Sequence, residues 1–365
     1  MIYSLIILGF IFIVGLVIGS FLNVVILRTV SEESIVFPSS KCPKCQTPLK
    51  WYHNIPVLSY VFLKGKCAFC HEKISWQYPL VELLTGIIFI LMFLRFCTPF
   101  DEFFGLNVIN AITYPQIITY IFSLIISCLF IVIAGTDFIE MKVSDAHTYP
   151  VVWISILYSI TLAAMNFIYY KNTMGMPKID LNFIMTCPVI YTISAAIICF
   201  IFMEAIRRLT AFIVKMEAFG QGDSYIAAGI GAVFGALLGN SVNYLYFSKI
   251  LYALLAIFLL SAIIPVIFIF PMYVKSLFKQ KNWLTLGGLS AFIIYAIGYF
   301  LAKQYGWLDS NAALILCSIV LALLGLLVCR EIIRGMKQHN SDGFPCPFGP
   351  ALVSAAFIAM LTLPL

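Results

Sequence analysis

The chain has 365 residues, of which 62% are hydrophobic and only 10% are charged, whereas soluble globular proteins carry roughly 25% charged residues. So little charge cannot cover the surface of a soluble protein of this length, and the net charge of +6 is small. The composition therefore excludes a soluble enzyme, a disordered chain and a nucleic-acid-binding protein. It predicts an all-α polytopic membrane protein.

Apolar runs close to the ~20 residues that a helix needs to cross a bilayer recur along the chain. The first, Ile2–Leu27, has no basic residue before it and is followed by Arg28, which predicts a retained helix with its N-terminus outside rather than a cleaved signal peptide. Nine further runs bring the expected total to about ten transmembrane helices: Leu80–Phe96, Ile117–Ala134, Tyr149–Phe167, Phe183–Phe202, Ser224–Leu238, Ile250–Tyr273, Trp283–Leu301, Ala312–Cys329 and Ala351–Leu365.

The distribution of basic residues tests this topology. With the N-terminus outside, 17 of the 22 Lys and Arg residues fall on the inner side and five on the outer side. Cytoplasmic loops of membrane proteins carry such an excess, so we interpret the inner side as the cytoplasm. The expected organisation is a first transmembrane helix (1–28), a cytoplasmic loop domain (29–79) and a multispanning domain (80–365).

The cytoplasmic loop contains four cysteines in two pairs, Cys42-Pro-Lys-Cys45 and Cys67-Ala-Phe-Cys70, with 21 residues between the pairs. Two such pairs can hold zinc through four thiolates, and a closed site of this kind is structural rather than hydrolytic. Two disulfides are the alternative, which the reducing cytoplasm disfavours. His71 could replace a cysteine ligand, although a solvated neighbour is the simpler interpretation.

Two aspartates are expected at the same, cytoplasmic membrane face. Asp137 follows the end of one apolar run, and Asp223 precedes another within Gly220-Gln-Gly-Asp-Ser. Ionisable groups this close to hydrocarbon are costly and usually functional. Either aspartate alone could simply cap a helix. The competing acids near these two are Asp145 and Glu217, and further acids near span ends, expected to act in packing or substrate binding, are Glu82 and Glu204.

Glycines around Asp223 suit a catalytic role. Gly220 and Gly222 allow a tight turn and the close approach of a substrate chain. The helix that follows has glycines at four-residue spacing, which lets a neighbouring helix pack closely: Gly231, Gly235 and Gly239. Two carboxylates held together would share a proton, so that one activates water while the other polarises the scissile carbonyl.

As an ordered set, these segments resemble the prepilin peptidases, or type IV leader peptidases, of the Gly-x-Gly-Asp aspartic protease class. The motifs that carry the resemblance span nearly the whole chain: Gly19-Ser-Phe-Leu-Asn-Val-Val-Ile-Leu-Arg28, the Cys-Pro-x-Cys pair, Trp51-Tyr-His-Asn-Ile-Pro-Val-Leu-Ser59, Gly65-Lys-Cys-Ala-Phe-Cys70, Ile74-Ser-Trp-Gln-Tyr-Pro-Leu-Val-Glu-Leu-Leu84, the Asp137 segment, Glu217-Ala-Phe-Gly-Gln-Gly-Asp223 and Pro347-Phe-Gly-Pro350.

The resemblance implies an enzyme of the bacterial inner membrane that removes the short basic leader from type IV pilin-like precursors, at the cytoplasmic membrane face. Its catalytic pair would be Asp137 and Asp223. Members with the cysteine-bearing loop also resemble N-methyltransferases that modify the new N-terminus with S-adenosylmethionine. Methyl transfer is implied by the resemblance alone.

The chain departs from the family pattern in three places. Ser144 stands where the family often has Pro, and Tyr225 where it often has Lys. The chain between Gly239 and the Pro-Phe-Gly-Pro segment is long enough for three spans, where the family usually has one, so we expect an extra helical hairpin around residues 250–301.

Three other functions remain open from the residues alone, one of which is an intramembrane aspartyl protease with a different substrate or without methylation. A membrane transporter or channel could use Asp137 and Asp223 as ion or proton sites, although no inverted repeat is evident. A membrane receptor could use the zinc loop to recruit a cytoplasmic partner, and the basic residues of the loop also suit anionic lipid headgroups.

Overall fold

The computed structural model describes residues 2–37, 39–97, 113–140, 145–174, 187–214, 220–238 and 349–362. Contacts divide the chain into two units, residues 1–261 with 347–365 and residues 262–346, and every described residue belongs to the first unit. Three predicted spans, together with the expected hairpin around 250–301, lie outside the described residues: Ile250–Tyr273, Trp283–Leu301 and Ala312–Cys329.

The described residues form helices, as the composition predicted, with two isolated β-bridges in the loop that follows the first helix. The helices are, in chain order, α1 (Ile2–Val30), the short 3-10 helix η1 (Trp51–Asn54), α2 (Leu58–Phe62), α3 (Gln77–Phe96), α5 (Tyr114–Glu140), α6 (Asp145–Met174), α8 (Pro188–Val214), α9 (Gln221–Leu238) and α13 (Gly349–Thr362).

Within the described residues, five helices are long and apolar enough to cross a membrane: Leu5–Val30, Gln77–Phe96, Tyr114–Glu140, His147–Thr173 and Pro188–Leu209. They correspond to the first five predicted spans. Two further predicted spans, Ser224–Leu238 and Ala351–Leu365, contain helices α9 and α13, but neither helix is among the five. The total of ten transmembrane helices therefore stays a prediction.

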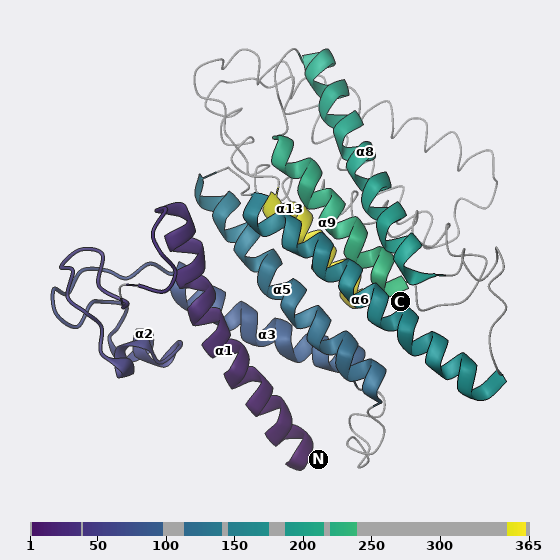
Figure 1. Cartoon of the computed structure of the whole chain (residues 1–365). Helices are drawn as coiled ribbons and strands as arrows, with labels where there is room; N and C mark the ends of the chain where they lie inside the picture. The colour runs from purple at the N-terminus through teal and green to yellow at the C-terminus, as the bar shows by residue number, and fades with distance from the viewer. Residues whose placement is uncertain are drawn as a thin grey trace, which may run out of the picture. The chain divides into compact units, whose positions relative to one another are not determined.

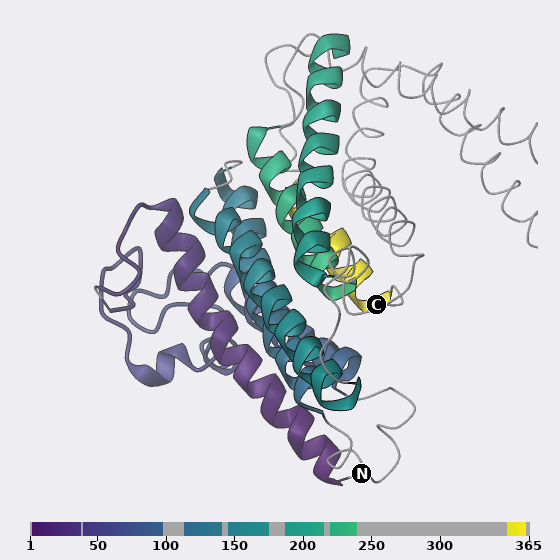
Figure 2. The same cartoon turned by 45° about the vertical axis from the view of Figure 1, so that its right-hand side comes forward.

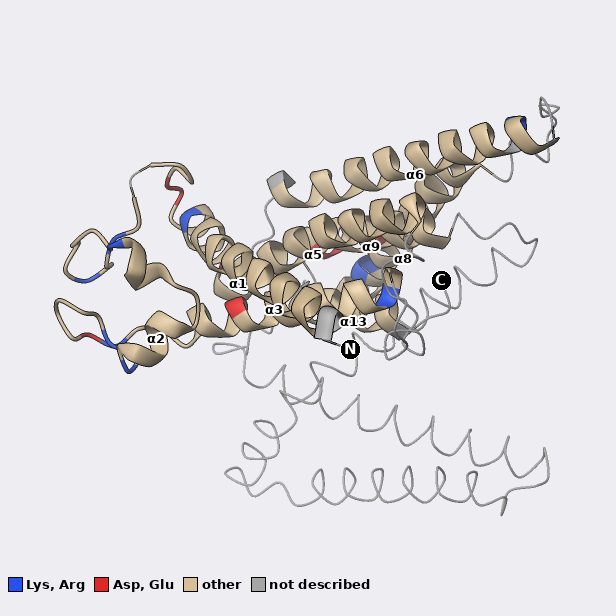
Figure 3. Cartoon of the chain, turned by 90° about the horizontal axis from the view of Figure 1, so that it is seen from below, with Lys and Arg blue, Asp and Glu red and all other residues tan. Residues whose placement is uncertain are grey.

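The helices pack in two groups of three (Figures 1 and 2). Helices α1, α3 and α5 contact one another, and so do α6, α8 and α9. The groups meet where α5 contacts α6, and α13 contacts α3, α5 and α9. The loop that carries α2 extends from the α1 side of the first group (Figure 1). Lys and Arg lie on this loop and toward the helix ends, so the lengths of the helices are nearly free of charge (Figure 3).

Helices α8 and α9 approach each other closely because glycines face the contact. A Cβ on Gly231 would collide with the Sγ of Cys199, and a Cβ on Gly235 would lie 2.7 Å from the carbonyl oxygen of Tyr191. The predicted role of the four-residue glycine spacing is confirmed for these two positions, whereas Gly239 lies outside the described residues.

A larger side chain in this contact should destabilise the protein. We expect Gly235→Val to lower the free energy of unfolding by about 1–3 kcal/mol, the usual cost of overpacking, because backbone atoms of α8 would have to move. The matched control is Gly9→Val, since nothing lies within 4 Å of a Cβ built on Gly9. Thermal unfolding in detergent measures both, and equal melting temperatures for the two variants would contradict the prediction.

Most helix boundaries differ from the predicted spans by several residues, and two of these differences concern the aspartates. Helix α5 ends at Glu140, six residues beyond the predicted end at Ala134, and α9 begins at Gln221. Each extension contains an aspartate and other polar residues, which lower its hydropathy, and hydropathy alone therefore assigned both to loops. They bring Asp137 into the end of α5 and Asp223 into the first turn of α9, so both aspartates are held by regular helices.

Candidate functional site: a four-cysteine cluster and two buried aspartates

The two cysteine pairs of the loop have the same backbone conformation. The N–H of Gln46 donates to the carbonyl of Cys42 at 2.9 Å, and the N–H of His71 donates to that of Cys67 at 3.1 Å. Gln46 and His71 both have positive φ, 56° and 58°. Each pair is closed by an isolated antiparallel bridge, Lys41 with Pro48 and Lys66 with Lys73. The loop thus contains one turn built twice, 25 residues apart.

The two turns bring the four cysteines together. One ligand atom from each of Cys42, Cys45, Cys67 and Cys70 lies within 4.8 Å of the others, and the Sγ atoms of Cys42 and Cys70 are 3.9 Å apart. Tetrahedral zinc with Zn–S bonds of about 2.3 Å requires sulfurs about 3.8 Å apart. All four thiols are free. The donor set therefore fits zinc and does not support two disulfides.

The loop environment already favours a thiolate at one of these cysteines. The side chain and backbone of Thr47 hydrogen-bond the Cys45 sulfur and lower the pKa of Cys45 to about 6. The backbone N–H of Glu72 lowers the pKa of Cys70, but burial and the neighbouring thiols outweigh it and raise that pKa to about 11. Four thiolates this close repel one another, and a divalent cation removes that repulsion.

The loop lacks a hydrophobic core of its own. Between residues 39 and 76, all of which the structure describes, the buried residues are Cys42, Gly65 and Cys67. Loops of this size need a metal, a disulfide or another constraint to fold stably. The cysteine cluster therefore occupies the position that a core would have. His71 is exposed and is not a member of the cluster, which favours the simpler interpretation of that residue.

A buried side chain of α3 holds the loop, and a buried side chain of α1 joins α1 to the first turn of α3. Buried Glu82 of α3 accepts the N–H of Val57 at 2.7 Å, which holds Val57 at a φ of 59°, an uncommon value for a β-branched residue. Buried Asn23 of α1 donates to the carbonyl of Tyr78 at 3.1 Å. Of the two roles expected for Glu82, these contacts support packing.

Asp137 and Asp223 are both buried, with 5% and 7% of their surfaces exposed. Asp223 lies outside the five candidate spans. Burial, followed by the negative charge of Asp137, raises the pKa of Asp223 to about 7, although a hydrogen bond from the backbone of Gly220 opposes the shift. The structure therefore brings the two predicted aspartates close enough for their charges to interact.

Asp223 also caps its helix, as the alternative interpretation predicted. Its Oδ2 accepts the N–H of Gly220 at 3.1 Å, at the start of α9. This bond involves one carboxylate oxygen and fixes the orientation of the group. Capping and a chemical role are therefore compatible for Asp223.

A charged cluster from α8 lies beside the first turn of α9. The Oγ of Ser224 donates to Glu204 at 3.3 Å, and Arg207 donates to both oxygens of Glu204 at 2.8 and 2.9 Å. Arg208 donates to the same carboxylate at 2.8 Å. This link joins α8 to the residue that follows Asp223. The sequence showed Glu204 near a span end, but nothing in the sequence identified Ser224 as its partner.

The remaining predicted positions are described only in part. Asp145 is the first residue of α6, but its side chain is outside the described set, as is all of Glu217. Tyr225 packs its ring against Tyr149 and Phe200, at centroid distances of 5.9 and 5.7 Å. Where the family pattern often has a cation, this chain therefore has an aromatic contact among α6, α8 and α9.

Comparisons with known proteins agree with the motifs. The family model described as Bacterial Peptidase A24 N-terminal domain matches residues 13–96. A prepilin leader peptidase/N-methyltransferase of Myxococcus xanthus is 48% identical over 87 residues, 24% of this chain and 26% of that protein. A protein of the same name from Klebsiella pneumoniae is 27% identical over 233 residues, which are 62% of this chain and 85% of that protein.

A third relative extends the same likeness. The type 4 prepilin-like proteins leader peptide-processing enzyme of Escherichia coli O78:H11 is 27% identical over 241 residues, 61% of this chain and 75% of that protein. No solved structure matches the chain. The predicted resemblance is confirmed: residues 13–96 match the family model of the bacterial peptidase A24 N-terminal domain, and the chain is similar to proteins named prepilin leader peptidase/N-methyltransferase.

Proposed function

We propose that the chain is a membrane aspartic endopeptidase that removes the leader peptide of type IV prepilin-like precursors at the cytoplasmic face of the bacterial inner membrane. The observation that carries the proposal is the pair of buried aspartates, in which the charge of Asp137 acts on Asp223. The names of the relatives supply the substrate class. In this topology the N-terminus of α1 lies outside and the cysteine loop inside.

The proposed mechanism uses one proton shared by the two carboxyls. The raised pKa of Asp223 favours its protonated form near neutral pH, in which it can donate to the scissile carbonyl oxygen. Asp137, ionised, then accepts a proton from the attacking water. Gly220 and Gly222 leave room for the substrate backbone beside Asp223. As the tetrahedral intermediate breaks down, Asp137 passes that proton to the leaving nitrogen and Asp223 regains its own from the hydroxyl, so the peptide bond breaks without a covalent enzyme intermediate.

We assign the four cysteines of the loop to a structural zinc ion, which their free thiols and short sulfur distances support. Four thiolates leave no open coordination position, so zinc takes no part in cleavage. Bound zinc would cross-link the two turns of the loop and thereby hold it against α1 and α3.

The names of the relatives also include N-methyltransferase, and we propose the same second activity on the freed N-terminus. S-adenosylmethionine would supply the methyl group when bound. No side chain among the described residues is assigned to its binding.

A cleavage assay tests the main proposal. Purified full-length protein in detergent is incubated with a type IV prepilin-like precursor, and mass spectrometry follows the mass of the leader and of the mature protein. Cleavage at one site after the leader supports the proposal. An intact precursor, under conditions in which a characterised prepilin peptidase cleaves it, contradicts it.

The pH dependence of cleavage follows from the pKa of Asp223. A raised pKa means that the carboxyl is protonated below about 7 and charged above it, so the general acid is lost as the pH rises. We expect the cleavage rate to fall above about pH 7, approaching tenfold per pH unit. Initial rates between pH 5 and about pH 9, with unfolding checked at each pH, measure this, and a constant rate up to about pH 9 would contradict the assignment.

A further inference from the structure

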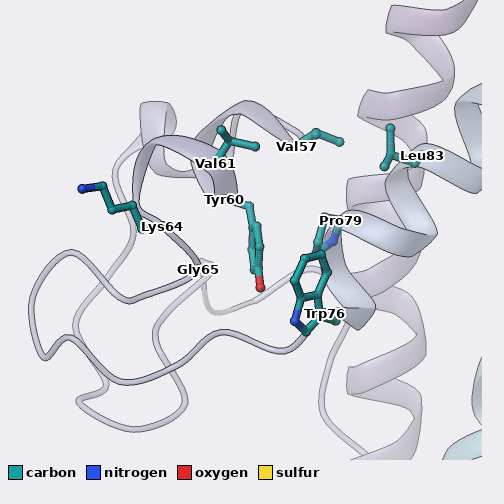
Figure 4. Close-up of a pocket in the computed structure, with 8 residues that line it drawn as sticks. All are labelled: Val57, Tyr60, Val61, Lys64, Gly65, Trp76, Pro79 and Leu83. Carbon is teal, nitrogen blue, oxygen red and sulfur yellow. The ribbon is translucent and has the colours of Figure 1, made fainter.

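An open cavity of about 350 Å³ lies where the cysteine loop meets the start of α3. Its walls are mainly apolar and include Val57, Tyr60, Val61, Trp76 and Leu83. The rings of Tyr60 and Trp76 are 5.4 Å apart and stand beside each other in the cavity (Figure 4). The cavity is therefore suited to an apolar group that enters from outside the protein.

The cavity continues an apolar surface of α3. Leu83 lines the cavity and also belongs to a face of α3 whose large side chains are exposed, with the others spaced three or four residues apart: Leu80, Leu84, Ile87 and Leu91. Since α3 is one of the candidate spans, this exposed face is expected to contact lipid chains. The cavity therefore lies at the end of a lipid-facing surface, where acyl chains meet headgroups.

The rim of the cavity carries positive charge and an exposed indole. Lys64 lines the cavity, and its ammonium group extends outward from the rim (Figure 4). Residues 39–76 contain six lysines and one glutamate. Trp76, 76% exposed, immediately precedes α3. Tryptophan beside a span start and lysine beyond it are the residues that proteins place at the headgroup level of a bilayer.

We propose that this cavity binds one anionic phospholipid. Its acyl chain lies along the exposed face of α3 and enters beside Leu83, the glycerol region contacts Trp76, and the phosphate pairs with Lys64. The apolar walls exclude a free phosphate as the main ligand, because most of the contact would be with hydrocarbon. The bound lipid would fill the space between the loop and α3 and steady the loop at the membrane surface.

Quenching of Trp76 fluorescence tests the proposal. The full chain is reconstituted in phosphatidylcholine bilayers that contain a small fraction of either phosphatidylglycerol or phosphatidylcholine with brominated acyl chains. The contribution of Trp76 is the difference between the parent protein and Trp76→Phe. We expect brominated phosphatidylglycerol to quench it more strongly. Lys64→Glu should reduce that preference by more than about fivefold, because loss of one lysine near an anionic surface accounts for about fivefold and the new carboxylate also repels the headgroup.

The control variant is Lys73→Glu, which makes the same charge change on the same loop outside the cavity. It should keep the preference, with zinc content and melting temperature confirming that both variants are folded. Equal quenching of Trp76 by the two lipids, or equal losses in the two lysine variants, would overturn the proposal. So would competition by glycerol phosphate, which has the headgroup chemistry but no acyl chain.

Discussion

Asp223→Asn should lose cleavage activity by about 10²–10⁴-fold, the range that one general acid or base contributes. Asparagine keeps the size of the side chain and can still accept the hydrogen bond from Gly220, but it cannot exchange a proton with Asp137. Asp137→Asn should lose a similar factor, because each carboxyl needs the other. Initial rates of leader release by the purified variants measure both losses.

The double variant separates a catalytic pair from two independent sites. Residues that act as one unit are not additive, so Asp137→Asn combined with Asp223→Asn should be little slower than either single variant. Asp145→Asn is the matched control, since Asp145 lies eight residues after Asp137 at the start of α6, and it should keep much more activity. A cleavage rate of the Asp223→Asn variant near that of the parent protein would contradict the protease assignment.

The same variants test the transporter alternative. If the two aspartates form an ion or proton site, their replacement should change ion flux in proteoliposomes and leave cleavage intact. If they form the protease pair, cleavage is lost and the parent protein shows no flux that depends on either residue. Melting temperatures of the variants confirm that a loss of activity does not reflect unfolding.

Hydropathy located the first five helices well but not their polar ends. The predicted run from Ile117 to Ala134 lies within α5, yet the helix continues through Asp137 to Glu140. An apolar count stops at the first polar residues, whereas the backbone continues its hydrogen bonds until packing or a cap ends the helix. The position of Asp137 inside α5, buried rather than at a loop, could therefore not be obtained from composition.

The candidate site was predictable to the extent that its residues are close in sequence or repeat a spacing. The spacing of the two cysteine pairs predicted the four-cysteine cluster. Each pair makes one tight turn, and two such turns supply the four thiolates that zinc binds. The bond between Glu82 and Val57 joins residues 25 apart and depends on how the loop folds against α3. The contact of Ser224 with Glu204 depends in the same way on the register between α8 and α9.

The glycines show where spacing and tertiary structure agree. Four-residue spacing predicted a close contact with a neighbouring helix, and Gly231 and Gly235 make that contact with α8. The sequence could not identify α8 as the partner, since several apolar helices would have served. The close contact matters for the site because it sets the register in which Glu204 reaches Ser224, next to Asp223.

The largest expected effect outside the aspartates concerns the cysteine cluster. The parent protein should retain close to one zinc ion per chain, and Cys42→Ser should release it, because a serine hydroxyl is a poor zinc ligand and three thiolates bind less tightly than four. Cys42 is also one of the few buried residues of the loop, 7% exposed, so the loop should unfold locally when the metal leaves. Elemental analysis of purified protein and limited proteolysis of the loop measure the two effects.

Cys128→Ser is the matched control, since Cys128 is a free cysteine of α5 outside the cluster, and it should keep both zinc and protease resistance. Because residues 39–76 have no core without the cysteines, loss of zinc should change the whole loop rather than one side chain. Helices α5 and α9 hold the aspartates by their own packing, so cleavage should fall much less than methyl transfer.

A parent protein without zinc, with all four cysteines in disulfides, would contradict the metal assignment. Equal loss of cleavage and methylation in Cys42→Ser would instead show that the protease depends on the loop, through the bond between Glu82 and Val57 that joins the loop to α3.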